Sequence, residues 1–239
     1  MLSTGAVATG EQSLVPENLF HTLLTASKDS IDSQRLDSRT TFPLASHATL
    51  DAAKSFALKA LPLLGYSHMD FDAYEERVSD EDNEETGAFF QDGIIVHAQR
   101  SGAHDFLIGI VTTPNNEKLQ AKTDGSGELQ LPLGTNHLHY VLQTRIDYNT
   151  DRAGAFQETV IEGTYVRRSD ALAASKKCLI SDEVGKKDFV LYEEQDKSEN
   201  GEEWAYGEDV LVHAVSESGE NFKITVATPL LAHQRHKKN

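Results

Sequence analysis

Cysteine and long apolar runs are scarce in this sequence. Cys178 is the single cysteine among 239 residues, so the chain forms no disulfide within itself. No stretch reaches the roughly eighteen apolar residues that a membrane-spanning helix needs, and the first 14 residues lack the apolar centre of a signal peptide. The chain also has no Asn-x-Ser/Thr site for glycosylation. These absences indicate a reducing, intracellular setting, cytoplasmic or nuclear.

Positive charge is the second deficit. The chain has 22 Lys and Arg against 38 Asp and Glu, a formal net charge of −16. Binding to nucleic acids and anionic membranes draws much of its affinity from Lys and Arg, so both partners are disfavoured. A protein partner with a basic surface, or a second copy of the chain, stays compatible with this charge. Solubility alone is the simpler explanation of it.

Motifs of nucleotide and nucleophile chemistry are missing as well. The sequence contains no Gly-x-Gly-x-x-Gly, no P-loop and no Gly-x-Ser-x-Gly. We therefore expect no cofactor. Cys178 follows Ala and Leu residues on an expected helix, which is typical of a small core residue and not of a nucleophile.

What the chain does contain is one pattern twice. Residues 71–76 and 189–194 both read Phe-x-x-Tyr-Glu-Glu, and residues 94–98 match residues 210–214. Apolar periodicity predicts a helix over 49–61, with Ala52-Ala53, and a second over 169–179, with Ala173-Ala174. The third matching segment pairs Phe106, Ile108, Ile110 and Thr112 with Phe222, Ile224, Val226 and Thr228. These ordered matches predict two copies of a helix followed by three strands.

The second copy alone has a long hairpin ahead of it. Residues 139–148 and 156–166 read as two strands joined by turn residues, whereas the first copy has only the short segment 40–44 in that place. Residues 19–24 predict a short helical turn. The expected divisions are a disordered N-terminal segment (1–40), the first unit (41–116), a turn-rich linker with the hairpin (117–166), the second unit (167–230) and a basic tail (231–239).

These elements define an α+β fold. Each α-β-β-β unit would form an antiparallel sheet with its helix on one face. A unit of about 60–65 residues has a marginal core by itself. We therefore expect the two units to pack together as one pseudo-symmetric domain.

A resemblance covers both units and the hairpin. Thr164-Tyr165-Val166 leads into an Ala-rich helix, followed by Phe-x-x-Tyr-Glu-Glu, Val-x-Val-His-Ala and Gly-Glu-x-Phe-x-Ile. This order resembles repeats of uncharacterised intracellular fungal proteins. The resemblance implies a duplicated structure and carries no known activity.

Four residues recur in both units without an evident packing role. His97 and His213 occupy equivalent places, as do Tyr74 and Tyr192, each Tyr being followed by two glutamates. A His beside Tyr and Glu is a workable general acid–base set, so these four are the catalytic candidates. The simpler interpretation places them in an interface between the two units.

Other candidate residues concern metal and partners. His137 and His139 would share one face of a strand, but no third ligand is evident and we expect no metal site. Each unit has one acidic loop after its first strand. The partner-binding candidates in them are Asp80, Asp82, Glu84, Glu85 and the single tryptophan, Trp204.

The leading functional hypothesis is a non-enzymatic binding or adaptor protein that holds a protein partner on a sheet face or on its acidic loops. The alternative is a small-molecule-binding or lyase/isomerase-like enzyme with a pocket between the units, lined by the four recurring His and Tyr residues. A third hypothesis is an acidic mimic that competes for a nucleic-acid-binding protein.

Overall fold

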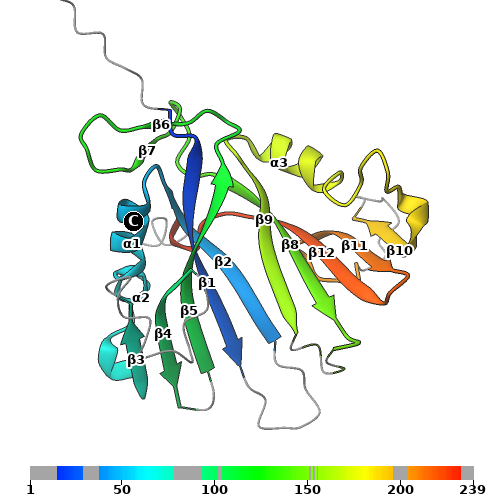
Figure 1. The fold of residues 1–239 in the computed structure, drawn as a ribbon, viewed down its shortest axis with the longest axis horizontal. Helices are drawn as coiled ribbons and strands as arrows, with labels where there is room; N and C mark the ends of the chain where they lie inside the picture. The colour runs from blue at the N-terminus through cyan, green and yellow to red at the C-terminus, as the bar shows by residue number, and fades with distance from the viewer. Residues whose placement is uncertain are drawn as a thin grey trace, which may run out of the picture.

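A computed structural model of the chain describes residues 15–28, 38–77, 93–101, 104–150, 152, 154, 156–195 and 204–232. Two five-stranded antiparallel sheets dominate it, and its helices are few and short, which confirms an α+β fold with two similar sheet units. Figure 1 shows the sheets side by side, with β3 at one outer flank and β10 at the other.

The first sheet has the order β2-β1-β5-β4-β3. Its strands are β1 (Asn18–Lys28), β2 (Ser38–His47), β3 (Ala73–Glu76), β4 (Ile94–Arg100) and β5 (His104–Pro114). Helices α1 (Leu50–Ala57) and α2 (Ala60–Leu63) and the 3-10 turn η1 (His68–Asp70) connect β2 to β3. Ala53 of α1 and Leu61 of α2 are fully buried, as are Val96 of β4 and Ile108 of β5 in the sheet that the helices cover.

The second sheet has the order β9-β8-β12-β11-β10. Its strands follow the same connectivity as those of the first sheet, with β9 in the place of β2 and β10 in the place of β3. These are β8 (His139–Asp147), β9 (Gln157–Tyr165), β10 (Phe189–Glu194), β11 (Val210–Ser216) and β12 (Glu220–Ala227). Helix α3 (Arg168–Ser175) and the turn η2 (Lys186–Asp188) connect β9 to β10, and η3 (Leu230–Ala232) follows β12. Ala171 of α3 packs on Val141, Val212 and Ile224.

The strands and helices expected from the repeated pattern are present at both places. Thr49 caps α1, its hydroxyl accepting a hydrogen bond from the backbone N–H of Ala52, and the helix is eight residues long. Helix α3 is also eight residues long, and the residues that each helix buries match at a separation of 118: Ala53 with Ala171, and Ala57 with Ser175. The alignment of Ala52-Ala53 with Ala173-Ala174 was therefore wrong by three residues.

The first unit has its own long hairpin, which the sequence did not reveal. Residues 18–28 form β1 and pair with β2, so neither the disorder expected over 1–40 nor the helical turn expected over 19–24 describes them correctly. β1 lies between β2 and β5, and Leu19, His21, Thr22, Leu23 and Leu24 are all buried. A central strand covered on both faces loses the apolar alternation by which strands are recognised.

The cross-strand registers show the same rows of residues in both sheets. Thr25 pairs with Thr41 in the first hairpin, and Thr144 pairs with Thr159 in the second. Both threonine pairs share a hydrogen bond between hydroxyls, at 3.0 and 2.9 Å. The two units thus share the element order β-β-α-β-β-β.

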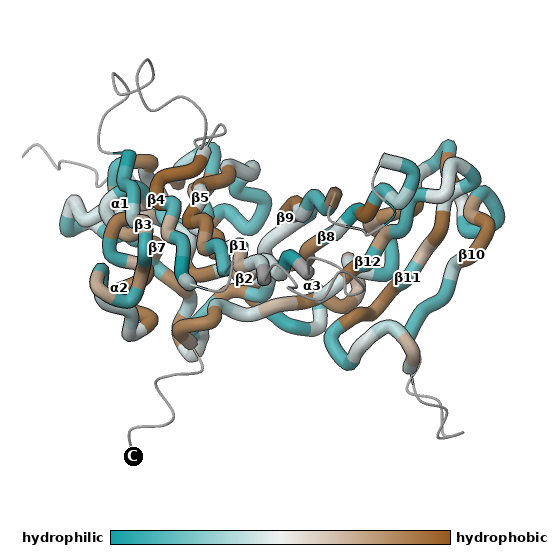
Figure 2. Tube along the Cα trace, turned by 90° about the horizontal axis from the view of Figure 1, so that it is seen from below, coloured by the Kyte–Doolittle hydropathy of each residue, from teal (hydrophilic) through white to brown (hydrophobic). Residues whose placement is uncertain are grey.

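A small hairpin lies between the units in the chain. Its strands are β6 (Gln120–Ala121) and β7 (Leu129–Gln130), which pair with each other. Leu129 joins Leu19, Leu138 and Tyr140 in a buried apolar cluster that contains residues of both sheets. Figure 2 shows α1 and α2 at one flank, β10 at the other, and β2, β8 and β9 between them.

Inside this junction lies a chain of hydrogen bonds. The ring nitrogens of His21 are 2.6 Å from Ser46 Oγ and 2.7 Å from Thr113 Oγ1, and Ser46 Oγ is 2.6 Å from Tyr140 Oη. The rings of His21 and Tyr140 meet edge to face, with centroids 5.8 Å apart. Burial lowers the pKa of His21 to about 4 and raises the pKa of Tyr140 to about 12.

Among the described residues, no helix has the length and apolarity that crossing a membrane requires.

Replacing Leu19 by Ala tests the role of β1. Leu19 is 1% exposed within the cluster at the junction, so Leu19→Ala should lower the free energy of unfolding by about 2–5 kcal/mol in chemical denaturation. Leu133→Ala is the control, because Leu133 is fully exposed and its truncation should change stability by less than about 0.5 kcal/mol. An equally small effect at Leu19 would contradict the packed position of β1.

Acid should weaken the junction through His21. Its folded-state pKa of about 4 lies below the usual 6.5, so the neutral ring contributes stability that is complete above pH 6.5 and is lost as the pH falls towards 4. The loss should approach about 3 kcal/mol. Denaturation midpoints measured across this range should fall more steeply for the wild type than for His21→Gln. Parallel curves would show that His21 does not titrate as described.

Candidate functional site

The recurring Tyr and His residues of the first unit lie on opposite faces of its sheet. Tyr74 pairs with Ala98 and packs into the core beneath the helices, and its ring stacks on His68 with centroids 3.9 Å apart. His97 pairs with Glu75 on the other face, and its Nε2 lies 3.5 Å from Asp105 Oδ1. The expected contact between the two side chains therefore does not form.

The second unit separates its pair in the same way. Tyr192 pairs with Ala214 on the helix side, whereas His213 pairs with Glu193 on the other face. The ring of His213 stacks on Tyr206 with centroids 3.9 Å apart, and burial lowers its pKa. The structure does not bring the four candidates together around one pocket, which removes the geometric basis of the proposed acid–base set.

The other candidates are dispersed too. The rings of His137 and His139 lie 5.1 Å apart, and burial and the neighbouring His137 lower the pKa of His139. Among the described residues no group of three or more metal-ligating side chains gathers. Trp204 is half-buried, 4.9 Å from Tyr206 between ring centroids, rather than standing free as an anchor. The remaining partner-binding candidates, Asp80, Asp82, Glu84 and Glu85, lie outside the described residues.

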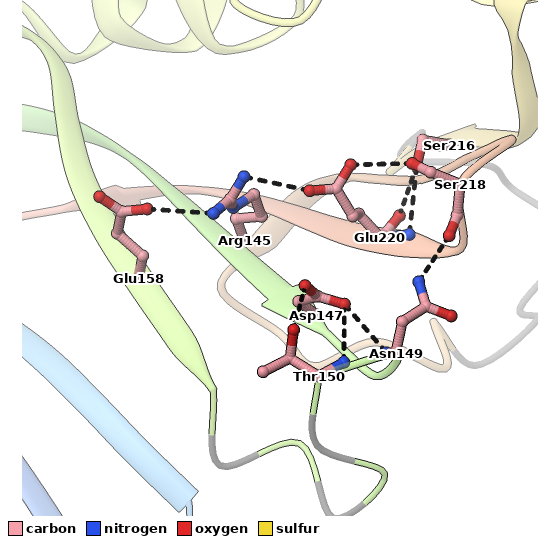
Figure 3. Close-up of polar contacts among 8 residues, drawn as sticks. All are labelled: Arg145, Asp147, Asn149, Thr150, Glu158, Ser216, Ser218 and Glu220. Atoms are coloured by element: carbon pink, nitrogen blue, oxygen red, sulfur yellow. Dashed lines mark hydrogen bonds and ion pairs between the residues drawn. The ribbon is translucent and has the colours of Figure 1, made fainter.

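Figure 3 shows a polar network at the turn end of the second sheet. Arg145 of β8 lies between carboxylates on the adjacent strands, 3.5 Å from Glu158 and 3.1 Å from Glu220. Asp147 turns away from this group and accepts hydrogen bonds from Asn149 and Thr150 of its own turn. The network ties three strands together, and its carboxylates are already satisfied by neighbours.

A groove of about 620 Å³ beside the start of α3 has room for a ligand. Three segments form it: the loop after β5, the strand β7 with the residues that follow it, and the passage from β9 into α3. The lining consists of Glu117, Lys118, Leu119, Gln120, Gln130, Leu131, Pro132, Leu133, Thr135, Val166, Arg167 and Asp170. The groove therefore lies where the connecting segment meets the second unit.

A buried amide shapes one wall of the groove. The side chain of Asn115 donates to the carbonyls of Pro16 and Leu119 and accepts from the N–H of Leu119, at 2.8–2.9 Å. These bonds close a tight loop in which Lys118 has a φ of 53°, the single positive φ of a non-glycine residue in the described chain. Such conformations persist where surrounding contacts fix them, and they are enriched at functional sites.

The groove combines an apolar floor with unpaired cations. Leu119, Leu131 and Val166 belong to the cluster at the junction of the sheets. In the part of the chain that the structure describes, neither Lys118 nor Arg167 has an acidic partner, although the whole chain has a net charge of −16. The carboxylate of Glu117 accepts a long hydrogen bond, 3.5 Å, from the N–H of Val166.

Sequence reasoning missed this groove because it assigned residues 117–166 to a turn-rich linker and a hairpin. One feature of the sequence pointed to it. Thr49, a good helix cap, has Arg167 as its counterpart 118 residues later, and α3 accordingly begins without a side-chain cap. An uncapped helix start in one unit alone marks the place where the two units differ.

Cys178 lies half-buried beside α3. Its Sγ donates to the carbonyl oxygen of Ser175 at 3.4 Å, and burial raises its pKa to about 12. Because the thiolate is the reactive form, this thiol is poorly suited to nucleophilic chemistry.

Comparison of the chain with protein-family models, with curated proteins and with solved structures found no match. The resemblance to fungal proteins accordingly stays a prediction.

Alkylation should reveal the raised pKa of Cys178. At pH 8 its thiolate fraction is far below that of an ordinary thiol, so iodoacetamide should modify the folded protein at least about tenfold more slowly than the unfolded chain. Mass spectrometry follows the reaction. Equal rates in the two states would contradict the buried, protonated thiol.

Proposed function

We propose that the chain is a non-enzymatic binding protein that holds an extended segment of a protein partner in the groove beside α3. The observation that carries this proposal is the groove itself, with its apolar floor and with two cations, Lys118 and Arg167, that have no acidic partner among the described residues. An open channel of this kind suits a chain segment that lays apolar side chains on the floor and polar groups at the rim.

The groove favours binding over catalysis. Its volume of about 620 Å³ lies in the range of small-molecule sites, which was the basis of the alternative hypothesis. However, neither His97 nor His213 lines it, nor does Tyr74 or Tyr192. A lyase or isomerase would need a general base at hydrogen-bond reach of its substrate. The two carboxylates that line the groove already accept hydrogen bonds, Glu117 from the N–H of Val166 and Asp170 from the hydroxyl of Ser169, so we favour the binding function.

We further infer that the two units are repeats packed as one domain about an approximate twofold axis. His21 and Tyr140 support this, because they contact each other and occupy equivalent places: His21 pairs with Ser46 in the first hairpin, and Tyr140 with Thr164 in the second. The groove then lies beside the junction that such packing creates.

The charge distribution of the chain suits a partner that has a basic surface and a binding segment of different charge. The net charge of −16 attracts a partner with a basic surface from a distance. At Lys118 and Arg167 the groove favours an acidic residue in the segment that enters it, whereas Glu117 and Asp170 in the same lining favour a basic one.

Selection from a library of displayed random peptides tests this function. Peptides enriched on the purified full chain should bind in the groove, and the variant Lys118→Glu with Arg167→Glu should weaken their affinity at least about tenfold, because attraction becomes repulsion. Fluorescence anisotropy with labelled peptides measures the dissociation constants.

The matched control carries the same charge change elsewhere. Lys177→Glu with Lys187→Glu alters two exposed lysines that do not line the groove, and binding should persist. Failure to enrich any peptide, or an equal loss in both double variants, would refute the groove as the binding site.

A further inference from the structure

In the first unit, the place beside the helix start is already filled by the chain itself. The N–H of Ala48 donates to the carbonyl of Gly127 at 2.8 Å, and His47 forms an antiparallel bridge with Glu128. Gly127 has a φ of 69°, and a Cβ on it would overlap Thr49 Oγ1 and lie 2.8 Å from Ala52 Cβ. A glycine followed by an acidic residue therefore sits against the start of α1.

The second unit has the same place, and it is the groove. Val166, Arg167 and Asp170 follow Ala48, Thr49 and Ala52 by 118 residues, the separation that also relates the buried residues of α1 and α3. All three line the groove. The residues that receive Gly127 in the first unit thus have counterparts that face open space in the second.

The backbone donor is available there. Val166 N–H contacts only the Glu117 carboxylate among the described residues, at 3.5 Å, whereas its counterpart Ala48 has a carbonyl at 2.8 Å. A carboxylate oxygen of Glu117 therefore stands near the position that a carbonyl oxygen occupies in the first unit. A bond of 3.5 Å is at the limit of a hydrogen bond, so a well-placed carbonyl would replace it favourably.

We propose that the groove binds an extended protein segment in the way that the first unit binds residues 126–129: a glycine followed by an acidic residue, running antiparallel to Tyr165–Val166. This rests on the proposed function and names the chemistry of the bound segment. The glycine carbonyl accepts from Val166 N–H. Glycine is required because the chain passes directly over the helix start, and the acidic side chain meets Lys118 and Arg167.

Continuity with existing packing supports the same occupant. Leu129 and Leu131, which follow Glu128 at alternate positions, are part of the apolar cluster between the sheets. The floor of the groove, formed by Leu119, Leu131 and Val166, extends that cluster to the surface. An apolar residue placed after the acidic one would cover this floor.

The chain supplies its own probe. A synthetic peptide with the sequence of residues 124–131, Asp-Gly-Ser-Gly-Glu-Leu-Gln-Leu, is titrated into the full-length protein. Amide NMR spectra should shift at Val166, Arg167 and Lys118, and the peptide with Gly127→Val or Glu128→Lys should bind at least about tenfold more weakly.

Three protein variants sharpen the result. Lys118→Glu with Arg167→Glu should abolish the discrimination between the peptide and its Glu128→Lys form, whereas Lys177→Glu with Lys187→Glu should preserve it. Glu117→Ala frees the N–H of Val166 and should leave affinity unchanged or raise it.

The outcomes separate this inference from the function on which it rests. If selected peptides bind the groove but the Gly-acidic peptide binds no better than a scrambled one, this inference is wrong and the binding function stands. If neither binds, both are wrong. Binding that appears only after deletion of residues 2–14 would assign the groove to the chain's own N-terminal segment. Binding that competes with self-association of the protein would assign the groove to a second copy. Either result would overturn the proposal that the groove binds a segment of another protein.

Discussion

The hydrogen bonds from Thr113 through His21 and Ser46 to Tyr140 determine how the two sheets meet. Apolar contacts alone are indifferent to orientation, whereas buried polar groups must find their partners or lose about 1–3 kcal/mol each. Burial of the apolar cluster around Leu19 and Leu138 stabilises the contact between the sheets. The hydrogen bonds favour one relative orientation of the two sheets. The groove borders this cluster, so its shape depends on the relative orientation of the sheets.

The sequence was a good guide wherever one side of an element faces water. The row Phe106, Ile108 and Ile110 recurs as Phe222, Ile224 and Val226, and Thr49 is a good helix cap, so β5 and α1 were predictable. It was a poor guide where both sides are covered. β1 buries Thr22 and Leu23 in succession, which erases the alternation that a strand would show.

The groove was hidden for a different reason. Its shape depends on the buried amide of Asn115 and on contacts between residues far apart in the chain, such as Glu117 with Val166. No local pattern of residue types predicts contacts between residues so far apart in the sequence. The repeated Tyr and His residues, in contrast, were conspicuous in the sequence yet serve different faces of the sheets, Tyr74 in the core and His97 opposite it.

The two similar sheet units contain one place in two versions, and the versions differ. Around α1 the connecting segment closes the site with Gly127, and Thr49 caps the helix. Around α3 neither feature is kept, and Arg167 stands where the cap would be. Losing a cap costs about 0.5–2 kcal/mol.

The short turn η3 has a consequence for how the protein is made. It lies against β2, and Leu230 packs into the core of the first unit, although it follows the last strand of the second. The ribosome synthesises the first unit about a hundred residues before it reaches Leu230. The core of the first unit therefore lacks Leu230 throughout synthesis of the second unit. The chain is therefore expected to reach its native state as a whole, after translation of both halves, rather than one half at a time.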